Sequence, residues 1–550
     1  MSAGASSYDE VPYTSLAFPQ THPDHLAAVA CIFGLTPPDV TRCRVLELGC
    51  AGGGNLVPMA YNLPDSEFVG IDHSPRQVAE AREAIAAFGL NNIRVEVASV
   101  EEVDRKWGTF DYIICHGVFS WVEPPVQDSI LRIAGEQLTP QGVAYVSYNT
   151  YPGWHTRQMV RDMMRYHAAQ FADAGEQVAQ ARALLSFLAA AAGQDGPYGQ
   201  WLTAEAERAG RAADSYVFHE HLERTNLPLY FHQFAARAER AGLQFLSEAA
   251  VSEMLTTHFP ASVAQTLDRI SPDILHLEQY MDFVRNRQFR QTLLCRADAH
   301  PRRALSAAVL RGRLVSSAAV AEGDVDLDPA TAVRFSNGQQ SAELTNPATK
   351  AAFALLAVAW PAAVPVDVLC DGALERARGF LPDVPADGAA DAVLEELFGA
   401  VMYGLVNLHT IQPPCTNEVS ERPRAHPLAR AQAERGALVI NGHHQTVDVD
   451  PLLREAVLAA DGTRTHAAIV EALVDAVTAG RLTLDDEATA RGTTRERIAA
   501  RVEPALETLK RCALLVAPPP DQSGITVTNI DAGDSSGGAA SGPRSASSME

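Results

Sequence analysis

A glycine-rich segment at residues 47–55 carries the strongest chemical signal in the sequence. It reads Glu-Leu-Gly-Cys-Ala-Gly-Gly-Gly-Asn and overlaps the end of the apolar run RVLEL, which predicts a buried strand. Glycines let a backbone approach a ligand closely and adopt angles that other residues avoid. A helix is predicted next, so the segment forms a loop between a strand and a helix. We expect ligand contacts in this loop from Glu47, Gly49, Ala51, Gly53 and Asn55.

Two carboxylates lie where such a loop holds its ligand. Glu47 stands two places before the first glycine, where a carboxylate can meet the ammonium group of a methionine tail. Asp72 ends the next predicted strand, and a carboxylate there can accept hydrogen bonds from both hydroxyls of a ribose. His73 follows directly and is expected at the same site. The pattern indicates a ribose-containing cofactor.

The glycine-rich loop alone does not distinguish a nicotinamide dinucleotide from S-adenosylmethionine. Glu47 favours S-adenosylmethionine, because a methionine tail supplies the cation that this carboxylate would meet. Two alternatives stay open at this point. One is a nicotinamide-dependent dehydrogenase, and the other is a plain α/β domain whose glycine-rich turn is only a turn.

Strands and helices alternate on both sides of the loop. Ser74 and Pro75 are typical of a helix start, and Gly89 is typical of a helix end. The alternation predicts βαβ units and therefore a doubly wound α/β fold with a parallel sheet. A strand at residues 243–247 follows an Ala-rich helical insertion and is a candidate late strand of the same sheet.

An internal repeat occupies the C-terminal half. Asn337-Gly338 and Asn441-Gly442 each lie between apolar flanks, and each precedes a proline and an Ala-rich helix by the same spacing. Asn-Gly between apolar runs predicts a hairpin with a type I′ turn. Hairpins and helices of this size suggest two tandem α+β modules of winged-helix type, although two unrelated hairpins remain an alternative.

The chain is too long for one hydrophobic core, so several domains are expected. The segments that we expect are a cofactor-binding domain with an N-terminal aromatic lid at 1–155, a helical insertion at 156–215, a further domain at 216–300, winged-helix-like modules at 301–415 and 416–517, and a disordered tail at 518–550.

Composition excludes several classes of partner. The 550 residues include 44 Lys and Arg against 67 Asp and Glu, a formal charge of −23. Such a chain repels phosphate backbones, which argues against a nucleic-acid partner. The eight cysteines form no C-x-x-C pair, so no metal is expected, and His443-His444 is interpreted as a surface pair. Without a signal peptide or an apolar span, the chain is expected in the cytoplasm. The sequence gives no oligomeric state.

The segment ELGCAGG resembles the first motif of the class I methyltransferases, with Ala51 in place of the middle glycine. Flanking segments resemble one bacterial family of that class, the methyltransferases with a "methyltransferase regulatory domain", which includes the rickettsial-type protein-lysine methyltransferases. The similar segments are YDEVPY at 8–13, FPQTHP at 18–23, HGVFSWV at 116–122, NTYPGWH at 149–155 and YVFHEHLERTNLPL at 216–229. The resemblance implies a Rossmann-like fold, S-adenosylmethionine as cofactor, and methyl transfer.

Class I enzymes bracket the adenine of the cofactor after the third strand, which here places Ser99 and Val100 at that position. The acid that is usual there is absent, so Glu101 or Glu102 is expected to substitute. His116 ends a predicted strand and is the residue expected nearest the methyl group. A histidine that merely packs in the core is the competing interpretation.

Methyl transfer from a sulfonium is an in-line displacement, so the enzyme chiefly aligns the acceptor and excludes water. A lysine amine has a solution pKa of about 10.4 and must react deprotonated, which an aromatic, desolvated channel favours. The residues that we expect to line this channel are His116, Trp121, Asn149, Trp154 and Tyr13.

Three functions follow from these features. The first is a protein-lysine methyltransferase, which the long C-terminal half favours because a metabolite needs no additional modules. The second is a small-molecule N- or O-methyltransferase. The third is a non-catalytic scaffold that binds S-adenosylmethionine.

Overall fold

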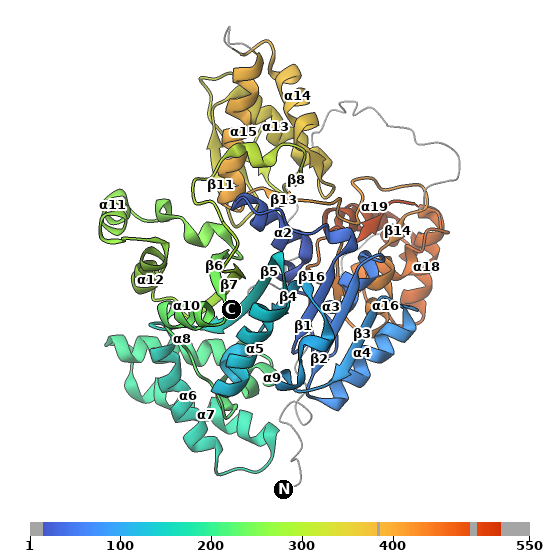
Figure 1. The fold of residues 1–550 in the computed structure, drawn as a ribbon. Helices are drawn as coiled ribbons and strands as arrows, with labels where there is room; N and C mark the ends of the chain where they lie inside the picture. Colours follow the sequence, from blue (N-terminus) through green and yellow to red (C-terminus); the bar gives the residue numbers. More distant parts are fainter. Residues whose placement is uncertain (1–14, 382–385, 485–491, 519–550) are drawn as a thin grey trace. The chain divides into compact units, whose positions relative to one another are not determined.

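The computed structural model describes residues 15–381, 386–484 and 492–518 (Figure 1). Two compact units share the chain. The first comprises residues 1–16 and 20–305, and the second comprises residues 17–19 and 306–550. The expected aromatic lid at Tyr8 and Tyr13, and the expected tail after Pro518, lie outside the described residues.

A seven-stranded sheet in the order β3-β2-β1-β4-β5-β7-β6 forms the centre of the first unit (Figure 1). Strands β1 to β5 pair in parallel, whereas β7 runs antiparallel to both β5 and β6. The bounds of the strands are β1 (Arg44–Leu48), β2 (Glu67–Asp72), β3 (Ile93–Val97), β4 (Phe110–Cys115), β5 (Leu138–Asn149), β6 (Leu243–Glu248) and β7 (Phe289–Arg296). The sequence predicts β1 to β6, with β5 indicated by the apolar run GVAYVSYN, and misses β7.

Helices cover the sheet, and its inner strands are therefore buried along most of their length. Helices α5 and α10 pack together against the sheet, while α3 and α4 cover β2 and β3. As predicted, Ser74 caps α4 by accepting a hydrogen bond from the Gln77 amide, and Gly89 follows the helix with φ of +61°. The helices are α2 (Pro23–Ile32), α3 (Leu56–Asn62), α4 (Pro75–Ala87), α5 (Pro124–Gln137) and α10 (Phe231–Arg240).

A helical insertion separates β5 from α10. Its α-helices enclose a small apolar core of their own, and a short π-helix at Phe218–Leu222 returns the chain toward the sheet. Two further helices lie between β6 and β7. The bounds are α6 (Trp154–Ala168), α7 (Ala174–Ala192), α8 (Pro197–Arg211), α9 (Asp214–Val217), α11 (Ala261–Ile270) and α12 (Ile274–Arg285).

The second unit contains two α+β parts that follow each other in the chain. Among the described residues, the first has the three-stranded sheets β12-β8-β13 and β11-β10-β9 with three α-helices, and the second has the pairs β14-β17 and β15-β16 with four α-helices. The bounds are β8 (Leu314–Ser316), β9 (Val320–Ala321), β10 (Val333–Ser336), β11 (Ser341–Leu344), α13 (Pro347–Ala359), β12 (Val364–Pro365), α14 (Val366–Ala377), α15 (Ala386–Met402), β13 (Asn407–His409), β14 (Arg424–Ala425), α16 (Pro427–Arg435), β15 (Leu438–Ile440), β16 (Thr446–Asp448), α17 (Pro451–Ala459), α18 (His466–Thr478), α19 (Thr494–Arg511) and β17 (Leu515–Val516).

Both predicted hairpins form, and each leads into a helix that begins with proline. The predicted type I′ turn is wrong, because neither Asn337 nor Asn441 has positive φ. Each asparagine instead accepts backbone hydrogen bonds through its side-chain oxygen, Asn337 from the amide of Gln339 and Asn441 from that of His443. Asparagine is therefore selected in both copies for its side chain, which closes the turn.

The interpretation of His443-His444 as a surface pair is also wrong. His444 is 4% exposed, and its φ of +58° departs from the alternation of an extended strand. The His443 ring stacks on Trp360, with centroids 4.9 Å apart and planes at 2°. His443 therefore packs against the first part of the second unit, and His444 is buried beside it.

Candidate cofactor and acceptor site

The glycine-rich loop joins β1 to α3 through three residues with left-handed backbone. Gly49 and Gly53 have φ of +80° and +76°. Ala51 has φ of +46°, a conformation that costs a residue with a Cβ about 1–2 kcal/mol. The amides of Gly49 and Cys50 both donate to the Ile71 carbonyl at 2.9 Å. The loop is thus tied to the end of β2.

Gly54 allows the chain near the N-terminus to touch this loop. The Gly54 amide donates to Ser15 Oγ at 2.7 Å, and a Cβ at position 54 would overlap the Ser15 carbonyl. Glycine is the residue that permits this approach. Ser15, the first described residue, therefore lies directly against the loop.

Glu47 is a buried carboxylate with one oxygen unused. It is 3% exposed, and its Oε1 accepts a hydrogen bond from Asn55 Nδ2 at 2.7 Å. Among the described residues, none donates to its buried Oε2. Burial raises the pKa of Glu47 to about 7, the Asn55 hydrogen bond opposes that rise, and the charge of Asp72 adds to it. A cationic ligand group would satisfy the unused oxygen.

Thr21 holds Asn55 in place and lies outside the residues that the sequence predicts for the site. The Asn55 amide donates to Thr21 Oγ1 at 3.0 Å, and the Thr21 hydroxyl lies 3.2 Å from Asn55 Oδ1. The signal that points to Thr21 is its place in the segment FPQTHP at 18–23. The contacts from Thr21 through Asn55 fix the direction of the Glu47 carboxylate.

Asp72 ends β2, and both of its carboxylate oxygens accept backbone hydrogen bonds. Oδ2 accepts from the Ala51 amide and Oδ1 from the Ser74 amide, each at 2.9 Å. An ionised carboxylate offers about four lone-pair sites, so two further donors can still be accepted. His73, the next residue, is exposed. Asp72 therefore braces the loop and keeps capacity for a ligand.

Ser99 and Val100 stand at the end of β3, where Ser99 caps the 3-10 helix Val100–Glu102. The Ser99 amide donates to Glu102 Oε2 at 2.8 Å, and Ser99 Oγ accepts from the Glu101 amide at 3.3 Å. This reciprocal cap occupies the Glu102 carboxylate. Of the two acids that the sequence offers as substitutes, Glu101 is the one whose carboxylate takes no part in the cap, and this residue is exposed.

His116 follows β4 and meets the hydroxyl groups of β5. Its Nδ1 lies 2.9 Å from the Tyr145 hydroxyl and 3.4 Å from Ser147 Oγ. The Gly117 amide also donates to Ser147 Oγ, at 2.8 Å. Burial lowers the pKa of His116 to about 4, so the imidazole is neutral at pH 7. The sequence misses Tyr145 and Ser147 because both lie inside an apolar strand.

Asn149 ends β5 and connects the two loops at this edge of the sheet. Its backbone amide donates to Ser120 Oγ at 2.9 Å, and its Nδ2 donates to Asn226 Oδ1 at 3.0 Å. The Leu227 amide donates to the Ser120 carbonyl at 2.7 Å. The extended chain after the π-helix therefore closes on the loop that follows β4. The signal that points to Asn226 is its place in the segment YVFHEHLERTNLPL at 216–229.

Trp121 and Trp154 meet edge to face, with ring centroids 6.3 Å apart and planes at 82°. Trp154 is 1% exposed, whereas Trp121 is half-buried. The Arg161 guanidinium lies 5.6 Å from the centroid of the Trp121 ring. The structure thus brings together the two tryptophans predicted for the acceptor channel, with Trp154 as the buried support. Tyr13, also predicted there, lies outside the described residues.

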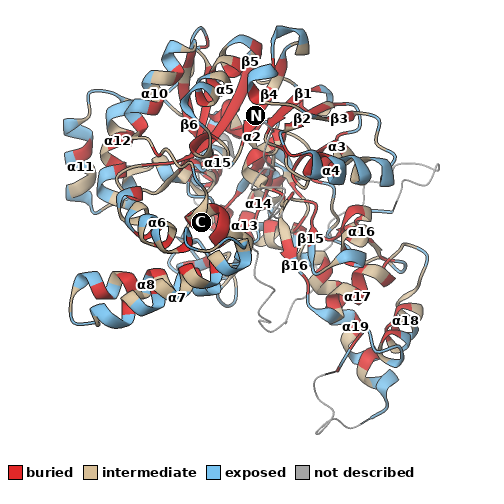
Figure 2. Cartoon of the chain, turned by 90° about the horizontal axis from the view of Figure 1, so that it is seen from below, coloured by how far each residue is buried: buried red, intermediate tan, exposed pale blue. Residues whose placement is uncertain are grey.

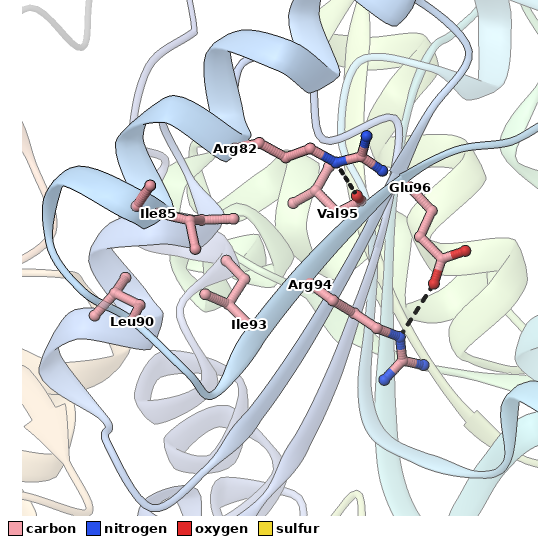
Figure 3. Close-up of a pocket in the computed structure, with 8 residues that line it drawn as sticks. Arg82, Ile85, Leu90, Ile93, Arg94, Val95 and Glu96 are labelled. Carbon is pink, nitrogen blue, oxygen red and sulfur yellow. Dashed lines mark hydrogen bonds and ion pairs between the residues drawn. The ribbon is translucent and has the colours of Figure 1, made fainter.

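A groove between α4 and β3 lies apart from these residues (Figure 3). Arg82 Nε donates to the Val95 carbonyl at 2.9 Å, and Arg94 pairs with Glu96 at 3.3 Å. The groove is lined by Arg82, Ile85, Ala86, Leu90, Ile93, Arg94, Val95 and Glu96. It shares no residue with the predicted site, and its own polar groups already pair with each other.

Two further kinds of feature are absent from the ranges that the structure describes. No helix there combines the length and the apolar character that crossing a bilayer requires. No group of three His, Cys, Asp or Glu side chains is arranged there to hold a metal ion.

Known proteins match this chain along most of its length. Family models match a methyltransferase domain at residues 39–203, a predicted methyltransferase regulatory domain at 213–296, and the C-terminal winged helix domain of PKMT at 421–514. RP789 of Rickettsia prowazekii is 34% identical over 88% of each chain. RP028 of the same organism is 38% identical over 44% of this chain and 96% of its own.

A solved structure, PKMT2 from Rickettsia typhi, has the same fold. It is 28% identical, with a TM-score of 0.82, and the match covers 92% of this chain and 100% of that chain. Its complex with AdoHcy matches with a TM-score of 0.83. The fold and the site define a class I S-adenosylmethionine-dependent methyltransferase. Within that class, the chain belongs to the family that carries the methyltransferase regulatory domain and the PKMT winged helix domain.

Proposed function

We propose that this methyltransferase transfers methyl groups to lysine side chains of a protein substrate. The observation that carries the proposal is the likeness to PKMT2 of Rickettsia typhi over 92% of the chain, together with the PKMT winged helix domain at residues 421–514. The rickettsial-type protein-lysine methyltransferases belong to this family. A metabolite acceptor would leave the C-terminal half without a role.

The residues of the loop fit S-adenosylmethionine. When bound, this cofactor supplies an electrophilic methyl group on a sulfonium. The buried Oε2 of Glu47 has no donor among the described residues and suits the ammonium of the methionine tail. Asp72 keeps lone pairs that would accept hydrogen bonds from the ribose hydroxyls, Gly49 and Gly53 would let the backbone approach the ligand, and Ser99 and Val100 would border the adenine.

The acceptor amine enters, in this proposal, between His116 and the loops that carry Trp121 and Asn149. A neutral His116 has no charge that would repel an incoming ammonium, because burial holds its pKa near 4. The half-buried Trp121 ring supplies an apolar wall, and such surroundings favour the neutral amine over the ammonium. No general base is required, since the amine can release its proton to water before it is aligned.

Label from S-adenosylmethionine with a tritiated methyl group tests the acceptor class. The chain is incubated with a bacterial lysate, and the proteins are then separated from the small molecules. The proposal expects label in the protein fraction, released as methylated lysine on acid hydrolysis. Label confined to the small molecules would replace the proposal with a metabolite methyltransferase, and no label in either fraction would favour a scaffold.

A further inference from the structure

Helix α12 (Ile274–Arg285) departs from the polarity of an ordinary surface helix, although it still buries Met281. Such a helix normally buries its apolar stripe and exposes its charges. In α12 the acidic residues Glu278 and Asp282 are each 0% exposed. Phe283 and Val284 on the other side are 47% and 52% exposed, and Figure 2 colours the ribbon of α12 by the burial of its residues.

Arg290 of β7 explains why the acids point inward. This buried arginine donates to Asp282 at 2.8 Å, to Glu278 Oε2 at 3.0 Å and to Glu248 Oε1 at 2.7 Å. A buried ion-pair cluster adds little net stability over apolar packing of the same volume. The cluster therefore accounts for the inward acids and leaves the outward apolar residues without a packing partner on the helix, and neighbouring exposed apolar residues are a candidate contact surface.

The exposed side of α12 is continuous with the acceptor site through a strip of rings. Phe283 contacts the Tyr230 ring at 6.1 Å between centroids, and Tyr230 contacts Tyr151 at 5.2 Å. Tyr151 stacks on His155 at 4.0 Å. Tyr151 is two residues beyond Asn149, at the edge of the sheet where the acceptor enters. We call Tyr151, His155, Tyr230, Phe283 and Val284 the aromatic strip.

We propose that the aromatic strip binds the polypeptide segment of the substrate that flanks the acceptor lysine, and that this segment is extended and carries apolar side chains. The inference rests on the proposed function, because the strip begins at the acceptor loop. α12 has 12 residues and is therefore about 18 Å long, which is the length of about five residues in an extended chain. Apolar side chains of that segment would cover Phe283 and Val284.

Steady-state kinetics with three synthetic acceptors tests the strip. The first is a peptide with a central lysine and Leu, Val and Phe on both sides, the second has serine at those positions, and the third is Nα-acetyl-lysine methylamide. The variant is Phe283→Ser with Val284→Ser, two exposed positions whose change spares the core. Its matched control is Phe187→Ser, at a residue of α7 that is 65% exposed.

For the double variant we expect KM for the apolar peptide to rise about tenfold, with kcat unchanged. Turnover of Nα-acetyl-lysine methylamide, cofactor affinity and the thermal midpoint should match those of the wild type, and Phe187→Ser should change nothing. The proposed role of the strip is refuted if the double variant leaves KM for the apolar peptide unchanged. It is also refuted if the wild type has equal KM values for the apolar and the serine peptide. Neither result bears on the proposed lysine activity.

Two other outcomes also decide against the strip. If the double variant changes the sedimentation coefficient, the patch contacts a second copy of the chain rather than a substrate. If the wild type methylates none of the three acceptors while it labels a metabolite, the proposed lysine activity fails, and the strip fails with it. If the wild type methylates Nα-acetyl-lysine methylamide but the double variant leaves KM for the apolar peptide unchanged, only the role of the strip fails and the lysine activity stands.

Discussion

Glu47→Gln separates the charge of the cofactor-loop carboxylate from its shape. Glutamine keeps an oxygen that can accept the hydrogen bond from Asn55 Nδ2, which Glu47 accepts at 2.7 Å. It removes the negative charge from the buried oxygen that faces the expected ammonium. Hydrogen bonds to charged groups contribute about 1.5–3 kcal/mol, so we expect the affinity for S-adenosylmethionine to fall by about 10- to 150-fold near neutral pH.

The same carboxylate makes binding depend on pH. Burial raises the pKa of Glu47 from 4.5 to about 7, so the free folded protein holds a proton there that the unfolded chain lacks in this window. The stability of the free protein therefore decreases as pH rises from about 4.5 to about 7. The ammonium selects ionised Glu47, so binding releases a proton. We expect the affinity of the wild type to fall about 25-fold between about pH 7.5 and about pH 5.5.

Titration calorimetry at both pH values, in buffers of different ionisation enthalpy, measures this effect. The wild type should release up to one proton at the lower pH, whereas Glu47→Gln should release none and bind with an affinity that changes little. The two proteins should therefore converge at low pH. Glu434→Gln, at an exposed glutamate of the second unit, is the control. A wild-type affinity that stays flat across this range would refute the assignment of Glu47 to the ammonium.

Three further substitutions test other parts of the structure, and a fourth tests the acceptor side. Asp72→Ala removes the acceptor of two backbone hydrogen bonds and of the expected ribose hydrogen bonds. The affinity for S-adenosylmethionine should therefore fall by about 2–4 kcal/mol, or about 30-fold or more, and the thermal midpoint should fall as well. An unchanged affinity in calorimetry would contradict the role of Asp72. Trp121→Ala should reduce turnover in a methyl-transfer assay and spare cofactor binding, and lost binding would place Trp121 on the cofactor side instead. Ala51→Gly relieves a left-handed φ of +46° and should raise the free energy of unfolding in urea by about 0.5–1 kcal/mol. A free energy of unfolding equal to or below that of the wild type would mean that the strain is absent. Arg290→Met leaves buried carboxylates without their partner and should lower the free energy of unfolding in urea by about 3–5 kcal/mol. An unchanged free energy of unfolding would rule out an ionised cluster.

Local sequence predicts the parallel part of the fold because its strands are either largely apolar or, in β3, alternate apolar residues with Arg94 and Glu96, and turn residues bound them. β7 is different. Its segment FRQTLLCR mixes polar and apolar residues, and its place between β5 and β6 depends on antiparallel pairing with segments far away in the chain. Burial of Arg290 in this strand likewise depends on acids from α12 and β6, which no short-range pattern reveals.

The cofactor side of the site follows from spacing, because glycines and acids at the ends of β1 and β2 must meet at one edge of a parallel sheet. The contacts that support them come from elsewhere. Thr21 reaches Asn55 from another part of the chain, and Asn226 reaches Asn149 across the helical insertion. The turns of the C-terminal repeat show the same limit, because the asparagine side chains rather than a type I′ backbone close them.

The position of the transferred methyl group decides whether lysine is the acceptor. The chain is incubated with lysate proteins and S-adenosylmethionine that carries a deuterated methyl group, and the proteins are then read by tandem mass spectrometry. We expect deuterated methyl groups on lysine Nζ atoms, and their loss in the Asp72→Ala variant. Deuterium found only in a metabolite, or on protein atoms other than lysine Nζ, would contradict it.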